Sequence, residues 1–201
     1  MMKKLVLLSL VVSSVAFAGD PPKGGAAGAP APGPADAKKM MAPPPGGDAK
    51  PPGPPQEIAD MAKGMSGTWK CVGKADVMGT MQDIKGTVTH KSDLDGWWIN
   101  TTINGTMAKG SMKNQMFTTY DAAAKKWYRV SANSHGGHAV SWGTAAGTKV
   151  SWEGDAHWGG KDLKIRGSEE MVSPKEAHIV GEMSDDGGKT WKPDHDVTCK
   201  K

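Results

Sequence analysis

The sequence predicts an all-β protein: a closed antiparallel β-barrel of about eight to ten strands, with a short N-terminal helix and a disordered leader. From Gly67 onward, short runs rich in Val, Ile, Thr, Trp and Tyr alternate with clusters of Gly, Asn, Asp and Ser. The runs recur about every 8–12 residues, which is typical of a sandwich or a barrel. Pro174 is the only proline between the leader and Pro193, so the strands keep their N–H donors. An open sheet of this many antiparallel strands would leave exposed edges, and closure into a barrel removes them.

The spacing of these runs sets the expected elements. Strands are expected near residues 67–77, 80–92, 96–105, 109–120, 126–134, 138–145, 148–157, 160–172, 177–184 and 190–199. Before them, residues 57–63 are expected to form a short helix, because Ile58, Met61, Ala62 and Met65 recur near helical spacing.

Hairpin turns are indicated by residues that tolerate positive φ angles. Asp95-Gly96 precedes a pair of tryptophans, and Gly187-Gly188 precedes the last expected strand. Residues 121–125 carry the only helical signal after the first strand, and the segment is short enough for a hairpin loop. Along the expected strand at 126–134, side chains alternate between the two faces, so one face carries Trp127, Arg129 and Ser131.

The first eighteen residues are expected to be a signal peptide. Lys3 and Lys4 give a positive start, residues 5–12 are apolar, and residues 16–18 (AFA) form a small-x-small cleavage site before Gly19. The apolar run is too short for a transmembrane helix, which needs roughly 20 residues. We therefore expect a periplasmic or secreted protein without a transmembrane segment.

Residues 19–56 are expected to form a disordered spacer rich in Pro, Gly and Ala. Only Met40 and Met41 could bury much apolar surface there, so the segment cannot offset the entropy of ordering. Repeated prolines favour an extended, semi-rigid chain. The segment is thus expected to hold the domain at residues 57–201 away from a surface. The alternatives are a ligand for a proline-binding module and a simple solvated tail.

The charge balance argues against a nucleic-acid partner. The whole chain carries a net charge of +4, but six of its lysines and only three of its aspartates lie in the first 56 residues. The expected domain therefore has 19 basic and 18 acidic residues and no basic stripe.

Cys71 and Cys199 are the only two cysteines, and in an exported chain they are expected to form a disulfide. Cys71 lies on the first expected strand and Cys199 at the end of the last. Barrel closure makes these two strands neighbours, so a structural bridge is expected rather than a reactive thiol pair.

Tryptophan is unusually frequent in the expected domain. The eight tryptophans are Trp69, Trp97, Trp98, Trp127, Trp142, Trp152, Trp158 and Trp191. We assign Trp69 and Trp127 to the core. The others either replace Phe as core filler or line a ligand cavity, since an indole combines apolar area with one donor.

The candidate ligand-binding residues follow from one choice of strand register. Adjacent Trp97 and Trp98 point to opposite faces, and placing Trp98 inside also places Asn100 and Thr102 inside as a polar patch. The other candidates for the lining are Met116, Trp142 and Trp152, with His157 as the polar group that orients a ligand. A slip of one residue would reverse every side chain.

No motif for catalysis, a cofactor or a metal stands out, so we expect no catalytic residue and no cofactor. His135 and His138, with His157 on another strand, are the nearest approach to a metal site, but solvated histidines in a Gly-rich loop fit the pattern better. Glu169 and Glu170 face oppositely in a strand and fail as a pair of glycosidase carboxylates.

Four short segments carry a resemblance to a known family. They are residues 67–71 (GTWKC), 94–98 (LDGWW), 152–154 (WEG) and 198–201 (TCKK). Together they resemble a family of exported bacterial proteins of unknown function with a lipocalin-like (calycin-like) β-barrel. The resemblance covers about residues 57–201 and implies fold and export, without catalytic residues. The Gly-x-Trp opening is similar to that of lipocalins, which implies that Trp69 closes the floor of the barrel. Haem-binding barrels of the nitrobindin type share this opening, but their Gly-rich continuation is absent here.

These observations lead to three expectations about function, in order of preference. The first is a non-enzymatic protein that binds a small apolar ligand in the barrel lumen. The second is a structural or interaction module of the cell envelope with a filled core and no ligand. The third is an enzyme, or a barrel that binds a metal or haem.

Overall fold

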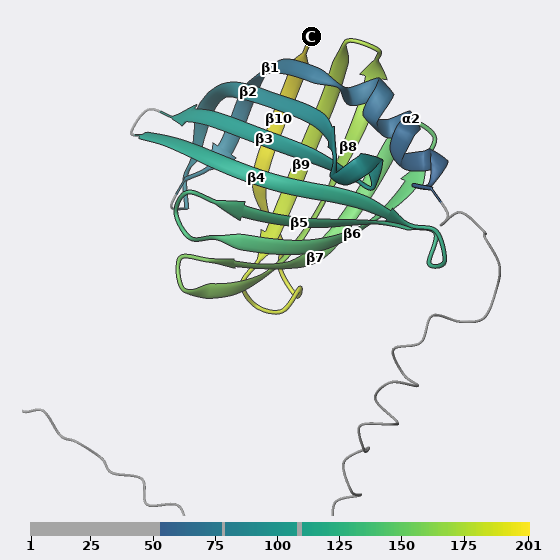
Figure 1. Cartoon of the computed structure of the whole chain (residues 1–201). Coiled ribbons are helices and arrows are strands. Elements are labelled where there is room, and N and C mark those ends of the chain that lie inside the picture. The colour runs from purple at the N-terminus through teal and green to yellow at the C-terminus, as the bar shows by residue number, and fades with distance from the viewer. Residues whose placement is uncertain (1–52, 78, 108–109) are drawn as a thin grey trace, which may run out of the picture. The chain divides into compact units, whose positions relative to one another are not determined.

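A computed structural model of the chain describes residues 53–77, 79–107 and 110–201, which form a ten-stranded closed antiparallel barrel with one short α-helix (Figure 1). The expected signal peptide and the leader up to residue 52 lie outside the described residues. The elements are α2 (Gln56–Met65), β1 (Gly67–Asp76), β2 (Met81–Asp93), the 3₁₀ turn η1 (Leu94–Gly96), β3 (Trp98–Met107), β4 (Gly110–Asp121), β5 (Lys126–Asn133), β6 (His138–Ala146), β7 (Lys149–Trp158), β8 (Lys161–Ser173), β9 (Glu176–Ser184) and β10 (Lys192–Lys200). The predicted fold class is confirmed, and none of the described helices is long and apolar enough to cross a membrane.

Each strand pairs with its sequence neighbours, and β10 closes the barrel by pairing with β1. Cys71 and Cys199 lie directly opposite each other in this closing ladder. They form the predicted disulfide, with their Cα atoms 4.0 Å apart. Hydrogen bonds and a covalent bond therefore join the first strand to the last, and both half-cystines are buried inside the barrel.

Burial alternates along the strands and identifies the face that points into the barrel. In β1, Trp69 and Cys71 are buried while their neighbours are exposed. In β3, Ile99 and Thr101 are the buried residues. The assignment of Trp69 to the core is thereby confirmed. Because side chains on one face recur every second residue, these buried positions fix the inward register of each strand.

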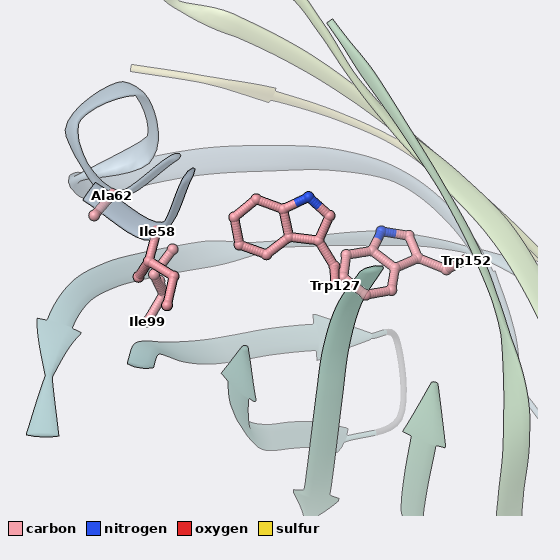
Figure 2. Close-up of a cluster of buried hydrophobic side chains, with 5 residues drawn as sticks. All are labelled: Ile58, Ala62, Ile99, Trp127 and Trp152. Atoms are coloured by element: carbon pink, nitrogen blue, oxygen red, sulfur yellow. The ribbon is translucent and has the colours of Figure 1, made fainter. Parts of the chain in front are cut away.

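Helix α2 covers one end of the barrel (Figure 1). Its buried residues Ile58 and Ala62 are four apart, so they lie on one helix face. They pack in a cluster with Ile99, Trp127 and Trp152, as Figure 2 shows. Trp127 is thus a core residue, as predicted. The helix closes its end of the barrel because this apolar face would otherwise be exposed.

A second cluster holds the closing strands together. It contains Trp69, Val88 and Val197 around the disulfide of Cys71 and Cys199. The Trp69 indole Nε1 donates to the carbonyl oxygen of Met65 at 2.8 Å, which ties the end of α2 to the barrel.

Two of the predicted turns adopt the backbone that their residues favour. Asp95 and Gly96 have φ angles of 56° and 86° in η1, between β2 and β3. Gly187 and Gly188 have φ angles of 77° and 94° between β9 and β10. Residues 121–125 form the predicted hairpin loop between β4 and β5.

Candidate functional site

The half of the barrel interior away from α2 is lined mainly by apolar side chains. Inward positions at that end of β3, β4, β8 and β9 carry long apolar side chains, each half-buried: Met107, Met112, Met116, Leu163, Ile165 and Met183. A side chain that points into a closed barrel can be exposed only through an open end or an unfilled interior. The half of the barrel opposite the helix therefore offers apolar surface within the lumen.

A buried ion pair crosses the interior between the helix and this apolar half. The Arg129 guanidinium on β5 donates two hydrogen bonds to the Glu169 carboxylate on β8, at 2.6 and 3.0 Å. Its Nε also donates to Thr118 Oγ1 at 3.2 Å, and its Cζ lies 3.8 Å from the ring centre of Trp152. Burial alone raises the pKa of Glu169, but the charge and hydrogen bonds of Arg129 outweigh it and hold the pKa below its usual range. The Glu169 carboxyl is therefore charged at neutral pH.

Two histidines also point into the interior. His90 on β2 shares a hydrogen bond with Thr101, with 2.9 Å between Nδ1 and Oγ1. Burial lowers the pKa of His90 to about 4, so this imidazole is neutral at pH 7. His195 on β10 pairs with Asp194 at 2.8 Å, and its charge also helps to lower the pKa of the Glu169 carboxyl.

Glycines make room for the large rings in this interior. A Cβ atom on Gly181 would lie 2.3 Å from the His195 ring, and one on Gly143 would lie 2.7 Å from the Trp152 ring. The strands carry glycine at these positions because any side chain would displace the ring beside it.

Among the described residues, two buried polar atoms have no hydrogen-bond partner: Trp152 Nε1 and Asn114 Oδ1. An unpaired buried polar group costs about 1–3 kcal/mol, so each such atom needs an explanation. The indole Nε1 of Trp152 can donate to a bound molecule, and the amide oxygen of Asn114 can accept from one.

The structure brings only two of the five predicted lining residues into the barrel. Met116 and Trp152 point inward, as predicted. The prediction is wrong for Trp98, Trp142 and His157, which lie on the outer face.

The physical reason for these errors is strand register. Ile99 and Thr101 are the buried residues of β3, so Trp98, Asn100 and Thr102 point outward. Ser141 and Gly143 are the buried residues of β6, which places the intervening Trp142 outside. A shift of one residue was enough to reverse the predicted faces.

The histidines near the open end do not assemble a metal site. The rings of His138 and His157 stack on the outer face with their centres 5.4 Å apart, and His157 pairs with Asp162 at 2.8 Å. No group of three or more metal-binding side chains has suitable geometry within the described residues. Glu169 and Glu170 face oppositely, as expected, since Glu169 is inside and Glu170 is exposed.

Sequence reasoning missed the polar interior formed by His90, Arg129, Glu169 and His195. The only sequence signal was that Arg129 shares a strand face with the core residue Trp127. These residues come from four strands far apart in the chain, and only barrel closure makes them neighbours.

The outer face carries two shallow depressions open to solvent. One, of about 540 Å³, crosses β7 to β10 and includes the outward-facing Ser151, Glu153, Arg166, Ser168 and Glu182. The other, of about 510 Å³, crosses β1 to β3 and includes Lys70, Lys85, Thr87, Asn104 and Thr106.

Comparison with known proteins supports the fold. No protein-family model and no curated protein matches the chain. Among solved structures, the barrel is similar to the crystal structure of Rv2717c from M. tuberculosis. The TM-score is 0.54 at 10% sequence identity, and the match covers 77% of this chain and 99% of that chain. At this level of identity, the likeness shows the fold alone.

Proposed function

We propose that the protein binds a small, mainly apolar molecule in the barrel lumen, through the end opposite α2. The observation that carries the proposal is the set of apolar side chains that point into a closed barrel and yet stay half-buried. Met112, Met116 and Met183 represent this set. Methionine suits such a surface, because its flexible, polarisable side chain adapts to different apolar shapes.

The polar layer beneath this apolar surface would orient the ligand. Arg129 and Glu169 already satisfy each other. The groups available to a ligand are the unpaired Trp152 Nε1 and Asn114 Oδ1, and the Nε2 of His195, whose Nδ1 is paired with Asp194. Ligand sites are mostly apolar and contain a few placed polar groups, and this interior has the same composition. His195 therefore replaces His157 as the proposed orienting imidazole.

The proposal includes the finer expectations from the sequence. In this proposal the barrel is lipocalin-like, the protein is exported, and the Pro/Gly/Ala-rich spacer precedes the barrel domain. The disulfide between Cys71 and Cys199 supports export, because such bonds persist in oxidising compartments.

The test compares two substitutions on adjacent residues of β4. Met112→Trp adds bulk inside the barrel, whereas Lys113→Trp adds the same ring on the exposed outer face. The neutral apolar dye N-phenyl-1-naphthylamine is titrated into each protein and into the wild type. We expect the wild type to bind the dye saturably. We expect Met112→Trp to weaken the affinity by about tenfold or more, which is the size of effect seen when a central contact of a binding site is lost. Lys113→Trp is expected to bind like the wild type.

A wild type that does not bind the dye saturably, or equal binding by the two variants, would contradict the proposal. With either of these results, a structural barrel with a filled core would be the better description. Thermal melts of both variants establish that each is folded. Native mass spectrometry of protein purified from its own host distinguishes the remaining alternatives, because a bound lipid, metal ion or haem would each add its own mass.

A further inference from the structure

The charges inside the barrel limit the kind of head group that a ligand can have there. Among the described residues, Arg129 is the only lysine or arginine that is not exposed to solvent. Its guanidinium already donates two hydrogen bonds to the Glu169 carboxylate and one to Thr118. An anionic head group would therefore meet the Glu169 carboxylate without a free cation to balance its own charge. Burying an unpaired charge in this way is strongly unfavourable.

The unpaired groups of the described interior include both a donor and acceptors. Trp152 is 6% exposed, and its Nε1 donor has no hydrogen-bond partner among the described residues. Asn114 Oδ1 is a buried acceptor that likewise lacks a partner there. His195 Nδ1 is paired with Asp194, and because an ionised carboxylate can only accept, Nδ1 carries the proton. In the neutral imidazole, Nε2 is then a further acceptor.

The Trp152 donor and the His195 acceptor lie at one level of the barrel. Trp152 is paired in register with Gly167 on β8. Gly167 is paired with Gly181 on β9, and Gly181 with His195 on β10. Since the two residues between the rings are glycines, no side chain of this row separates Trp152 from His195. Two residues further along β9, Met183 begins the apolar half of the interior, so the polar level lies directly beside apolar surface.

We propose that the lumen ligand is a neutral long-chain amphiphile with a hydroxyl head group, and that fatty-acid carboxylates bind poorly. This inference rests on the proposed lumen site and names its ligand class. A hydroxyl group both donates and accepts, so it can pair with Trp152 Nε1 or with the acceptors Asn114 Oδ1 and His195 Nε2. It also brings no charge that needs a counterion. The alkyl chain then packs on the methionines of the half away from α2.

The experiment titrates three ligands with chains of equal length against the full chain loaded with N-phenyl-1-naphthylamine. In mildly alkaline buffer, decanol donates and accepts, decyl methyl ether only accepts, and decanoate is an anion. We expect decanol to displace the dye from the wild type at concentrations about tenfold or more below those of decanoate. Decyl methyl ether is expected to need about threefold more than decanol, which corresponds to the loss of one hydrogen bond.

Glu169→Gln changes the charge inside the barrel, because it leaves Arg129 without its anion. We expect this variant to bind decanoate about tenfold or more tightly than the wild type does, since a charge-assisted hydrogen bond can now form. Its affinity for decanol is expected to change little. The control Glu182→Gln removes a carboxylate paired with Arg166 on the outer face and is expected to keep the wild-type order of affinities. Thermal melts establish that each variant is folded, and if Glu169→Gln is not, the wild-type order decides.

Decanoate that binds the wild type as tightly as decanol would overturn this inference. A folded Glu169→Gln variant that keeps the wild-type order would overturn it as well. In both cases, saturable dye binding would leave the lumen site itself intact. A wild type that does not bind the dye overturns both proposals, so the two failures are distinguishable.

Discussion

The buried ion pair between Arg129 and Glu169 allows a quantitative test of how the interior is organised. Glu169→Gln keeps the shape of the side chain but removes the charge that neutralises Arg129. The two side chains are only 13% and 22% exposed, so water cannot replace the lost partner effectively. Removing one partner of a buried pair costs about 3–5 kcal/mol, and the residual exposure places our expectation near the lower value, about 3 kcal/mol.

The matched control is Glu182→Gln, which breaks the pair with Arg166 between β8 and β9. Those side chains are 44% and 42% exposed, so we expect a loss of about 0–1 kcal/mol. The double variant Arg129→Met/Glu169→Gln is expected to recover about 2 kcal/mol of the loss, because it leaves no unpaired buried charge.

Urea unfolding followed by tryptophan fluorescence gives the free energy of unfolding for each protein. An equal loss for Glu169→Gln and Glu182→Gln would refute the reasoning, because it would mean that Arg129 and Glu169 are as well solvated as the surface pair. A double variant less stable than Glu169→Gln would also count against it.

Two further predictions concern the disulfide and the pH dependence of stability. The disulfide closes a loop with a sequence separation of 128, so Cys71→Ser/Cys199→Ser should lower the free energy of unfolding by roughly 2–5 kcal/mol; an unchanged urea midpoint would contradict this. Because the pKa of His90 falls from 6.5 to about 4 on folding, the unfolded chain binds a proton in this range that the native protein does not. The free energy of unfolding should therefore fall by about 3 kcal/mol between pH 7 and 4. His90→Gln should flatten that part of the profile, and a slope identical to that of the wild type would exclude His90 as its source.

The sequence alone was enough to predict the architecture. Turn residues at regular spacing and β-branched or aromatic runs predicted strands close to those observed, because local backbone preferences set these boundaries. The pairing of Cys71 with Cys199 followed from topology, since the first and last strands of a closed barrel must be neighbours. A short helix was predicted at residues 57–63, within the observed helix at residues 56–65, because its apolar spacing repeats within a few residues.

Only the tertiary structure decided which face of each strand points inward. Trp98 and Ile99 are both apolar, so composition could not choose between them, and the barrel buries Ile99. In β5, by contrast, Trp127 and Arg129 were correctly placed on one face, but nothing local showed that Arg129 would be buried. Its partner Glu169 is 40 residues away in sequence, and the two meet only because the closed barrel brings β5 and β8 across a shared interior. Strand spacing is a local property that sequence specifies, whereas a register choice and a cross-barrel contact depend on the packing of the whole chain.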